Sequence, residues 1–441
     1  MRRLKFLWIS PDIRNRLLIS LGLLAIYRLA AHVPVPDVNR LAIAQMFAQA
    51  GGGQTLFGLL DLLSGGTVST FSVLAMGVYP YITGQIILQI LVPIIPPLQA
   101  RMEEDPREGR KWMEKWTYYL AIPMAALQAI GQIRLFQQFA GQNILNFNLG
   151  FNLPTLTIIS TMTAGTMFAI WLGELISEHG IRNQGLSLII FAGIVSRIPA
   201  NLSQLLQNQQ QRFAILGFFI FITVLTIFVI VFVQEGRRHV PVMYPGRRVG
   251  NRMSMPVKGT LPLMVNMAGM IALIFAQSIL TFPSVLAQFF IGSSSEFIAR
   301  VGEWLQNNFG GLNSTYWILY FFMVVGFTFF YTDVLFQQQN YGENLKRSGA
   351  QVPGVTKGTA TQRYLTRVMR RITLPGALFL GVVAIMPFLV GVVSPLGGSQ
   401  QGLQLVTSAG LLIVVGVIRD TYRNIEAELK LRGYDSALLV H

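Results

Sequence analysis

Few residues in this chain have the types and spacing that catalysis or metal binding requires. The 441-residue sequence has no cysteine, which excludes disulfides and Cys-ligated metal sites. Its four histidines are scattered, and no HExxH-like pair occurs. They are His32, His179, His239 and His441. We therefore expect no metal site, no catalytic site and no cofactor.

Nucleotide-binding motifs are also missing from the sequence. It has no GxxxxGK[ST] loop, and no glycine-rich dinucleotide fingerprint follows a strand. No Ser/His/Asp set is suggested either. We expect that the chain is not an enzyme, and that a partner supplies any driving force.

Ionisable groups inside long apolar segments are the remaining candidates for chemistry, because a charge in hydrocarbon is costly and usually functional. They are few. Arg28 and His32 lie in the first such segment, where Arg28 can snorkel or form an internal pair, and Glu174 lies near the end of the fourth. A proton- or sodium-coupled transporter usually needs carboxylates near the middle of the membrane. Their scarcity counts against that class.

The composition indicates that these segments lie in lipid. The chain is 52% hydrophobic and 12% charged, whereas soluble domains carry about 25% charged residues. So little polar surface cannot cover a water-soluble globule. We expect no cleavable signal peptide, because the basic start MRRLKFLWISPDIRNR contains no short apolar core with a cleavage site. The net charge of +15 suggests basic cytoplasmic loops.

Ten segments are apolar and long enough to cross about 30 Å of hydrocarbon. With the N-terminus in the cytoplasm, 28 of the 34 Lys and Arg fall in inner segments, as the positive-inside rule requires. Both termini are therefore predicted to be cytoplasmic, with the chain spanning the cytoplasmic membrane. The predicted spans are residues 17–34, 74–95, 117–134, 154–174, 186–205, 213–233, 261–282, 315–335, 372–393 and 403–419.

Ten spans divide into five and five, in an N-terminal half 1–205 and a C-terminal half 206–441. An odd number of spans per half makes the second half begin on the opposite side of the membrane, which is the inverted topology of many transport folds. The predicted fold class is an all-α membrane protein with ten transmembrane helices in two inverted five-helix halves.

Two features depart from simple spans. Leu56–Leu63 is apolar but only about 12 Å long as a helix, so it cannot cross the membrane. Because Ser64-Gly65-Gly66 ends it, we interpret residues 56–70 or so as a short re-entrant half-helix on the outer side. The cytoplasmic loops 234–260 and 336–371 are long and basic, whereas most connections are far shorter.

Several separated stretches resemble the SecY family of bacterial protein-conducting channels. These matches follow one another in order over nearly the whole chain, and we therefore identify the sequence as a member of that family. The stretches are LLSGGTVSTFSVLAMGVYPYITGQIILQIL (62–91), WLGELISEHGIRNQGLSLIIFAGIV (171–195), VNMAGMIALIFAQSIL (265–280), NLKRSGAQVPGVTKGTATQRYLTRVMRRITLPGALFLG (344–381) and LLIVVGVIRDTYRNIEAELKLRGYDSALL (411–439).

The resemblance implies a channel for secretory polypeptides that is closed by a ring of apolar side chains and a plug, and that opens sideways to release membrane proteins. Without the resemblance, the six residues of this ring would be interpreted as ordinary apolar residues that face lipid or pack between helices. The implied ring is Val78, Ile82, Ile190, Ile194, Ile274 and Ile413. The implied plug contains Leu60, Asp61, Leu63, Ser64, Gly65 and Gly66. Hydrogen bonds across the lateral gate are expected from Thr83, Gln128 and Asn266.

The resemblance also implies partners: the small membrane subunits SecE and SecG, the SecA motor, the ribosome with its rRNA and nascent chain, signal peptides and membrane lipids. We assign docking to the basic loops, because RNA phosphates attract clustered cations. The docking residues are Arg247, Arg248, Arg252 and Lys357. The family often has arginine where this chain has Thr356, and a lysine beside it does not replace a guanidinium fork. Ala272 and Asp61 replace a frequent proline and asparagine.

Two other classes of membrane protein remain as alternatives. A secondary transporter of small solutes fits ten spans and inverted halves, but it lacks the intramembrane carboxylates and does not explain the basic loops. A scaffold or assembly subunit fits the helices but does not explain the short half-helix. Transport of a secretory precursor, rather than of a small solute, distinguishes a channel from both.

Overall fold

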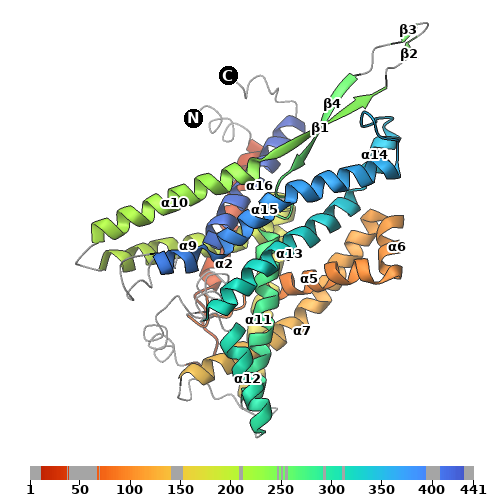
Figure 1. Cartoon of the computed structure of the whole chain (residues 1–441). Helices are drawn as coiled ribbons and strands as arrows, with labels where there is room; N and C mark the ends of the chain where they lie inside the picture. The colour runs from red at the N-terminus through yellow and green to blue at the C-terminus, as the bar shows by residue number, and fades with distance from the viewer. Residues whose placement is uncertain are drawn as a thin grey trace. The chain divides into compact units, whose positions relative to one another are not determined.

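The chain is mainly helical in the computed structural model (Figure 1). The structure describes residues 11–36, 38, 67–68, 70–140, 152–207, 212–245, 248–249, 252–253, 257–291, 295–309, 313–393 and 408–431. Packing divides the chain into two compact units. The first comprises Met1–Ile220, Ser278–Tyr316 and Pro387–His441, and the second comprises Phe221–Gln277 and Trp317–Met386. The inverted halves 1–205 and 206–441 concern membrane topology and stay a prediction.

The first unit is built around long helices. Helix α7 packs against α5 and α8, α8 also contacts α2 and α9, and α16 contacts α9. The helices of this unit are α2 (Pro11–Ala30), α5 (Tyr79–Ile94), α6 (Pro96–Glu104), α7 (Pro106–Ala140), α8 (Leu153–His179), α9 (Gly185–Gln207), α12 (Glu296–Phe309) and α16 (Ser408–Leu431). Four helices continue from one unit into the other, namely α10 (Arg212–Glu235), α11 (Ile271–Ile291), α13 (Ser314–Gln339) and α15 (Thr359–Val393).

Prolines and a cap determine several helix ends. Proline occupies the first turn of α5, α6 and α8, where its missing N–H costs nothing. Helices α5 and α6 are bent by 100° at a break next to Pro96, because proline disfavours helical backbone at the residue before it. At the start of α7, Asp105 Oδ1 accepts the N–H groups of Arg107 (2.9 Å) and Glu108 (3.3 Å).

The segment that precedes α5 is anchored in the core of the first unit. Phe71 is fully buried there and packs with residues of α7 and α8 such as Ala125 and Ile158. A side chain at Gly165 would collide with the carbonyl oxygen of Val73, so the close approach of α8 to this segment requires glycine. The chain is therefore fixed in place directly before α5 begins.

The second unit contains a β-hairpin beside its helices. Strand β1 (Arg237–Tyr244) pairs antiparallel with β4 (Val257–Met264), and β2 (Arg248–Val249) pairs with β3 (Arg252–Met253). Helix α14 (Tyr341–Arg347) lies wholly in this unit, and so does the greater part of α15, up to Met386. Alternate residues of β1, including Val240 and Val242, are buried against Phe336 and Leu365.

This hairpin corrects the predicted all-α fold, which has no strand in the basic cytoplasmic loop 234–260. Pro241 and Pro262 interrupt both strands, and a proline within a run argues against a strand. Pro241 lies two residues before Met243, so the backbone nitrogens of both residues point to the same side of the strand. The N–H of Met243 points away from β4 and donates to Gln351 O at 2.8 Å, and a proline at 241 therefore removes no bond to β4. The missing proline N–H therefore leaves the β1–β4 ladder intact.

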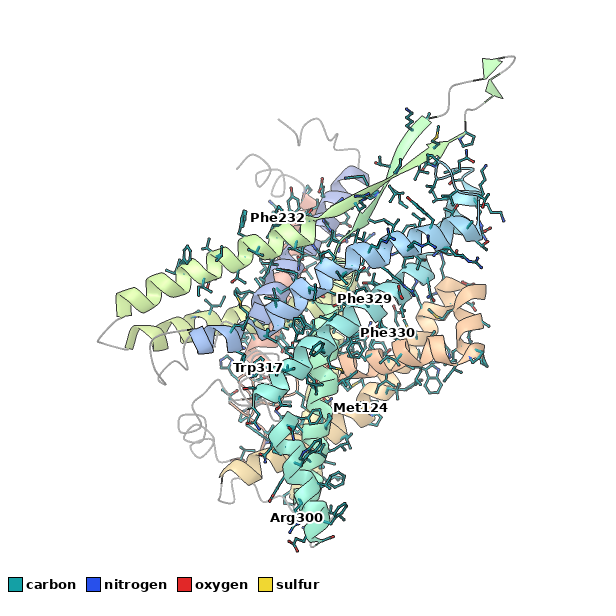
Figure 2. The ribbon with its side chains drawn as sticks, in the orientation of Figure 1. Met124, Phe232, Arg300, Trp317, Phe329 and Phe330 are labelled. Atoms are coloured by element: carbon teal, nitrogen blue, oxygen red, sulfur yellow. The ribbon has the colours of Figure 1, made fainter. Side chains whose placement is uncertain are left out.

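Several helices of the described part of the chain can cross a membrane. Three are individually long and apolar enough: Leu153–His179, Ser314–Arg347 and Thr359–Met386. The bent pair Tyr79–Val92 and Pro96–Met102 gives a fourth if it forms one span. Phe232 on α10 is 74% exposed, as expected of a lipid-facing helix (Figure 2). The full count of ten spans stays a prediction.

Three predicted spans begin clearly at other residues in the structure. The first helix begins at Pro11 rather than at residue 17. Helix α11 begins at Ile271 rather than at residue 261, because residues 257–264 belong to β4. The second predicted span starts at residue 74, but α5 begins at Tyr79 and residues 70–78 form turns.

Candidate functional site

The six residues expected in the apolar ring lie on or next to four helices. Val78 directly precedes α5 and Ile82 lies in its first turn, while α9, α11 and α16 carry the others. Five of the side chains are buried, from 2% exposed for Ile413 to 7% for Ile190 and Ile194, and Ile82 is half-buried. Burial argues against lipid-facing positions for these residues.

The spacing within each helix brings ring candidates onto one face. The carbonyl of Val78 accepts the N–H of Ile82 at 3.2 Å, and Ile190 and Ile194 stand one turn apart on α9. Apolar side chains that converge at a constriction hold water poorly and block ions by dewetting. Because Ile274 belongs to the second unit and the others to the first, closure of the ring stays a prediction.

Two of the three gate candidates contact each other. Gln128 Nε2 on α7 donates to Thr83 Oγ1 on α5 at 3.3 Å, and Thr83 Oγ1 donates to Tyr79 O at 3.0 Å. This bond joins the second and third predicted spans. The SecY resemblance implies that these two spans form one side of the lateral gate and that spans seven and eight form the other. Gln128 Oε1 is buried and has no hydrogen-bond partner in the described part of the chain. A bond across the seam stays a prediction.

The third gate candidate lies outside any helix. Asn266 was expected inside the seventh span, but it follows β4 and precedes α11. It is 2% exposed, and its Oδ1 accepts the N–H of Gly269 at 2.8 Å, so it shapes the turn that leads into α11. Gly269 has a φ of +58°, which favours glycine. Asn266 Nδ2 has no partner among the described residues.

The expected plug residues lie outside the described residues. They are Leu60, Asp61, Leu63, Ser64, Gly65 and Gly66. Thr67 and Val68, at the end of the predicted half-helix, are described and are buried. Thr67 Oγ1 donates to Leu74 O at 2.8 Å, so the chain is held tightly where the predicted plug ends.

The two basic loops form one body. Met243 of β1 and Gln351 exchange two backbone hydrogen bonds, of 2.8 and 2.9 Å. Residues of the hairpin and of 336–371 also share one buried cluster. Lys357 is exposed in the turn before α15, while Arg248 and Arg252 begin the short strands β2 and β3, with Arg247 outside the described residues. The sequence did not indicate that these loops are joined.

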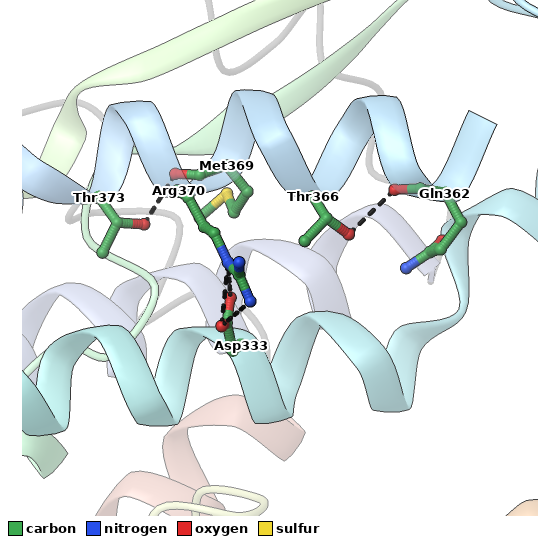
Figure 3. A network of polar contacts seen from close by, with 6 residues as sticks. All are labelled: Asp333, Gln362, Thr366, Met369, Arg370 and Thr373. Carbon is green, nitrogen blue, oxygen red and sulfur yellow. Dashed lines mark hydrogen bonds and ion pairs between the residues drawn. The ribbon is translucent and has the colours of Figure 1, made fainter. Parts of the chain in front are cut away.

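Sequence reasoning missed two charged contacts. Asp333 lies within the predicted span 315–335, and it accepts three hydrogen bonds from Arg370 on α15, with Arg370 Nη2 at 2.7 Å from its Oδ2 (Figure 3). An intramembrane carboxylate was the available signal. In the first unit, Glu428 Oε1 lies 3.1 Å from Arg16 Nη1 and 3.4 Å from Arg182 Nε. Only the fold reveals this second contact.

Comparison with known proteins decides the family. The SecY family profile matches residues 72–422, which is most of the chain. The chain belongs to the SecY family. It is 36% identical over 439 residues to the protein translocase subunit SecY of Streptomyces scabiei, covering 97% of this chain and 98% of that one. It is also 36% identical, over 443 residues and the same shares of both chains, to that of Mycobacterium tuberculosis.

Solved structures agree with this family at the level of the fold. One described as the structure of a protein conducting channel has a TM-score of 0.61 and 18% identity, covering 96% of this chain and 93% of that one. A second, concerned with the plug domain of the SecY protein, has a TM-score of 0.60 with the same identity and coverage. The helical SecY fold is therefore shared by this chain.

Proposed function

We propose that this SecY-family chain is the channel through which secretory polypeptides cross the cytoplasmic membrane and from which membrane proteins pass sideways into lipid. The observation that carries the proposal is the family match over residues 72–422, together with relatives named as protein translocase subunits that align over 97% of the chain. The apolar helices long enough to span a membrane support the location.

The proposed seal is the ring of Val78, Ile82, Ile190, Ile194, Ile274 and Ile413. Aliphatic side chains suit this task, because they exclude water when no chain is present and make no strong contact with a passing polypeptide. Burial of five of them supports an inward position. The segment 56–66 acts as the plug on the outer side, hinged by Gly65 and Gly66.

The proposed lateral gate uses Thr83, Gln128 and Asn266 as weak polar contacts. Hydrogen bonds between membrane helices contribute only about 0.6 kcal/mol on average, so a signal peptide can replace them. The amide atoms of Gln128 and Asn266 that have no partner among the described residues are available for this purpose. The Thr83–Gln128 bond keeps α5 and α7 together while the gate moves.

The proposed partners follow from the role of one subunit in a translocase. SecE and SecG are expected as the small membrane subunits, and the SecA motor or a translating ribosome supplies the driving force. Their docking surface is the hairpin and the 336–371 segment, which form one basic body and carry Arg248, Arg252 and Lys357.

Reconstitution tests the proposed function. Proteoliposomes that contain the chain with SecE and SecG should protect a secretory precursor from external protease only when SecA and ATP are added. The matched control is the same precursor without its signal sequence, which should remain accessible. Uptake of small solutes without any precursor transport would instead favour a secondary transporter. Transport of neither in a properly inserted complex would favour a scaffold subunit.

A further inference from the structure

One stripe of the α15 surface changes from basic to apolar along the helix. Its members recur every three or four residues, so they share one face. All six are exposed, and Leu374, the first apolar one, is 54% exposed. The stripe consists of Arg363, Arg367, Arg371, Leu374, Leu378 and Val382. Charge followed by aliphatic surface matches the order of headgroup and acyl chain in a phospholipid.

A groove accompanies the basic half of this stripe. It has a volume of about 740 Å³ and lies between α13 and α15, and all of its lining residues belong to the second unit. Arg363, Arg367 and Arg371 line it, and Phe329 and Leu374 form its apolar part. Phe329 is labelled on α13 in Figure 2. A volume of this size holds a polar headgroup with the first part of its chains.

The groove has a surplus of positive charge. Arg370 also lines it, but Asp333 neutralises Arg370 through the hydrogen bonds drawn in Figure 3. Among the described residues, Arg363, Arg367 and Arg371 have no carboxylate within 4.0 Å. Three guanidinium groups around one groove therefore remain available to an anion, and guanidinium groups bind phosphate oxygens in a bidentate manner.

We propose that this groove binds an anionic phospholipid of the cytoplasmic leaflet, with its phosphate among Arg363, Arg367 and Arg371 and its acyl chains along Leu374, Leu378 and Val382. The predicted topology places the basic end of α15 at the cytoplasmic surface, where anionic lipids accumulate. RNA would match the arginines but not the aliphatic continuation of the stripe, so the surface favours lipid. The inference is independent of the channel function.

Lipid titration of the purified chain, followed by native mass spectrometry, tests this site. Phosphatidylglycerol and phosphatidylcholine with identical chains serve as probes. The variant Arg367→Gln/Arg371→Gln should bind phosphatidylglycerol about 30-fold more weakly than the parent, since each arginine near the surface contributes roughly 1 kcal/mol toward anionic lipid. Its affinity for phosphatidylcholine should be unchanged, and its thermal unfolding midpoint should match that of the parent.

The matched control is Lys346→Gln/Arg347→Gln, which removes the same charge from α14, outside the groove. It should bind phosphatidylglycerol like the parent. Equal weakening in both variants would show a diffuse charge effect and overturn the site. The proposal also fails if the parent does not prefer phosphatidylglycerol over phosphatidylcholine. Complete displacement of the lipid by excess inorganic phosphate would mean that the groove binds phosphate alone. A groove variant that loses ribosome binding but keeps its lipid would mean that the groove binds RNA.

Discussion

Glu428 shows how a single carboxylate connects three parts of the first unit. It accepts contacts from Arg16 at the start of α2 and from Arg182 in the turn between α8 and α9. Asn424, one turn earlier on α16, donates to Arg182 O at 3.3 Å. The side chains of Glu428 and Arg16 are only 20% and 22% exposed, so their charges are partly desolvated and depend on each other.

Replacing Glu428 by Gln should therefore destabilise the first unit. Arg16 would keep its charge at a mostly buried position without a counter-ion, which costs about 1–3 kcal/mol. Arg182 is 63% exposed and would contribute little. Thermal unfolding of the purified protein measures the loss as a lower midpoint. Glu303→Gln on α12 removes an exposed carboxylate and should leave the midpoint unchanged; equal midpoints for both variants would contradict the prediction.

The proposed seal makes a second prediction at the residue scale. The double variant Ile82→Asn/Ile274→Asn should raise ion conductance in planar bilayers, because two amide side chains hold water in a constriction that aliphatic groups keep dry. Leu225→Asn on α10, where the side chain is 48% exposed, is a control for adding polar groups to a membrane helix. Conductance at the parent level in the folded double variant would remove these residues from the ring.

At the scale of elements, the segment 56–66 is predicted to be movable while its continuation is fixed. Thr67, Val68 and Phe71 are buried, so removal of residues 57–64 should leave the anchor of α5 intact. The shortened channel should insert and fold normally but show brief ion-conducting openings in single-channel recordings. An equal deletion of residues 142–149, in another outer segment, should not leak. If instead the first deletion prevents folding and gives no leak, the segment is a core element.

The elements also show how far the sequence could be interpreted. Long apolar runs such as 213–233 and 154–174 predicted helices α10 and α8 within a few residues, because hydrophobicity alone determines where such helices lie. The β-hairpin was missed because prolines hide its alternation. Asn266 was assigned to a helix because the run 261–282 looks continuous, whereas the structure ends β4 at Met264 and turns at Gly269.

Long-range contacts were beyond sequence reasoning for a physical reason. Arg370 and Asp333 are 37 residues apart, and Asn424 and Arg182 are 242 apart, so no helical or strand period relates them. The ring residues could be named only through the family resemblance, since an isoleucine in an apolar run has no local feature that distinguishes a pore from a packed core. Burial excludes a lipid-facing position for five of the six residues, and a conductance measurement distinguishes a pore position from a packed one.

At the scale of the whole molecule, the basic hairpin belongs to the same compact unit as two of the proposed channel residues. Asn266 and Ile274 follow β4 directly in the chain, and both lie in the second unit. The backbone there is tightly held: Val265 N donates to Gly236 O at 3.0 Å, and a side chain at Gly376 of α15 would come within 2.7 Å of Val265 O. A partner bound at the hairpin therefore acts on the unit that carries these residues.

The last prediction concerns that partner. Fewer cytoplasmic Lys and Arg would be enough to orient the spans. We therefore infer that the arginines concentrated in the hairpin bind an anionic surface such as ribosomal RNA. Reversing Arg247, Arg248 and Arg252 to Glu should weaken ribosome binding about tenfold or more and reduce the slope of log affinity against log salt by about 2 to 3. Membrane insertion should be normal, because the other inner charges remain. The matched control reverses Arg107, Arg110 and Lys111 on α7 to Glu, and it should bind ribosomes like the parent. If the parent, the hairpin variant and the α7 variant all bind ribosomes with the same affinity and the same salt slope, the hairpin does not contact RNA.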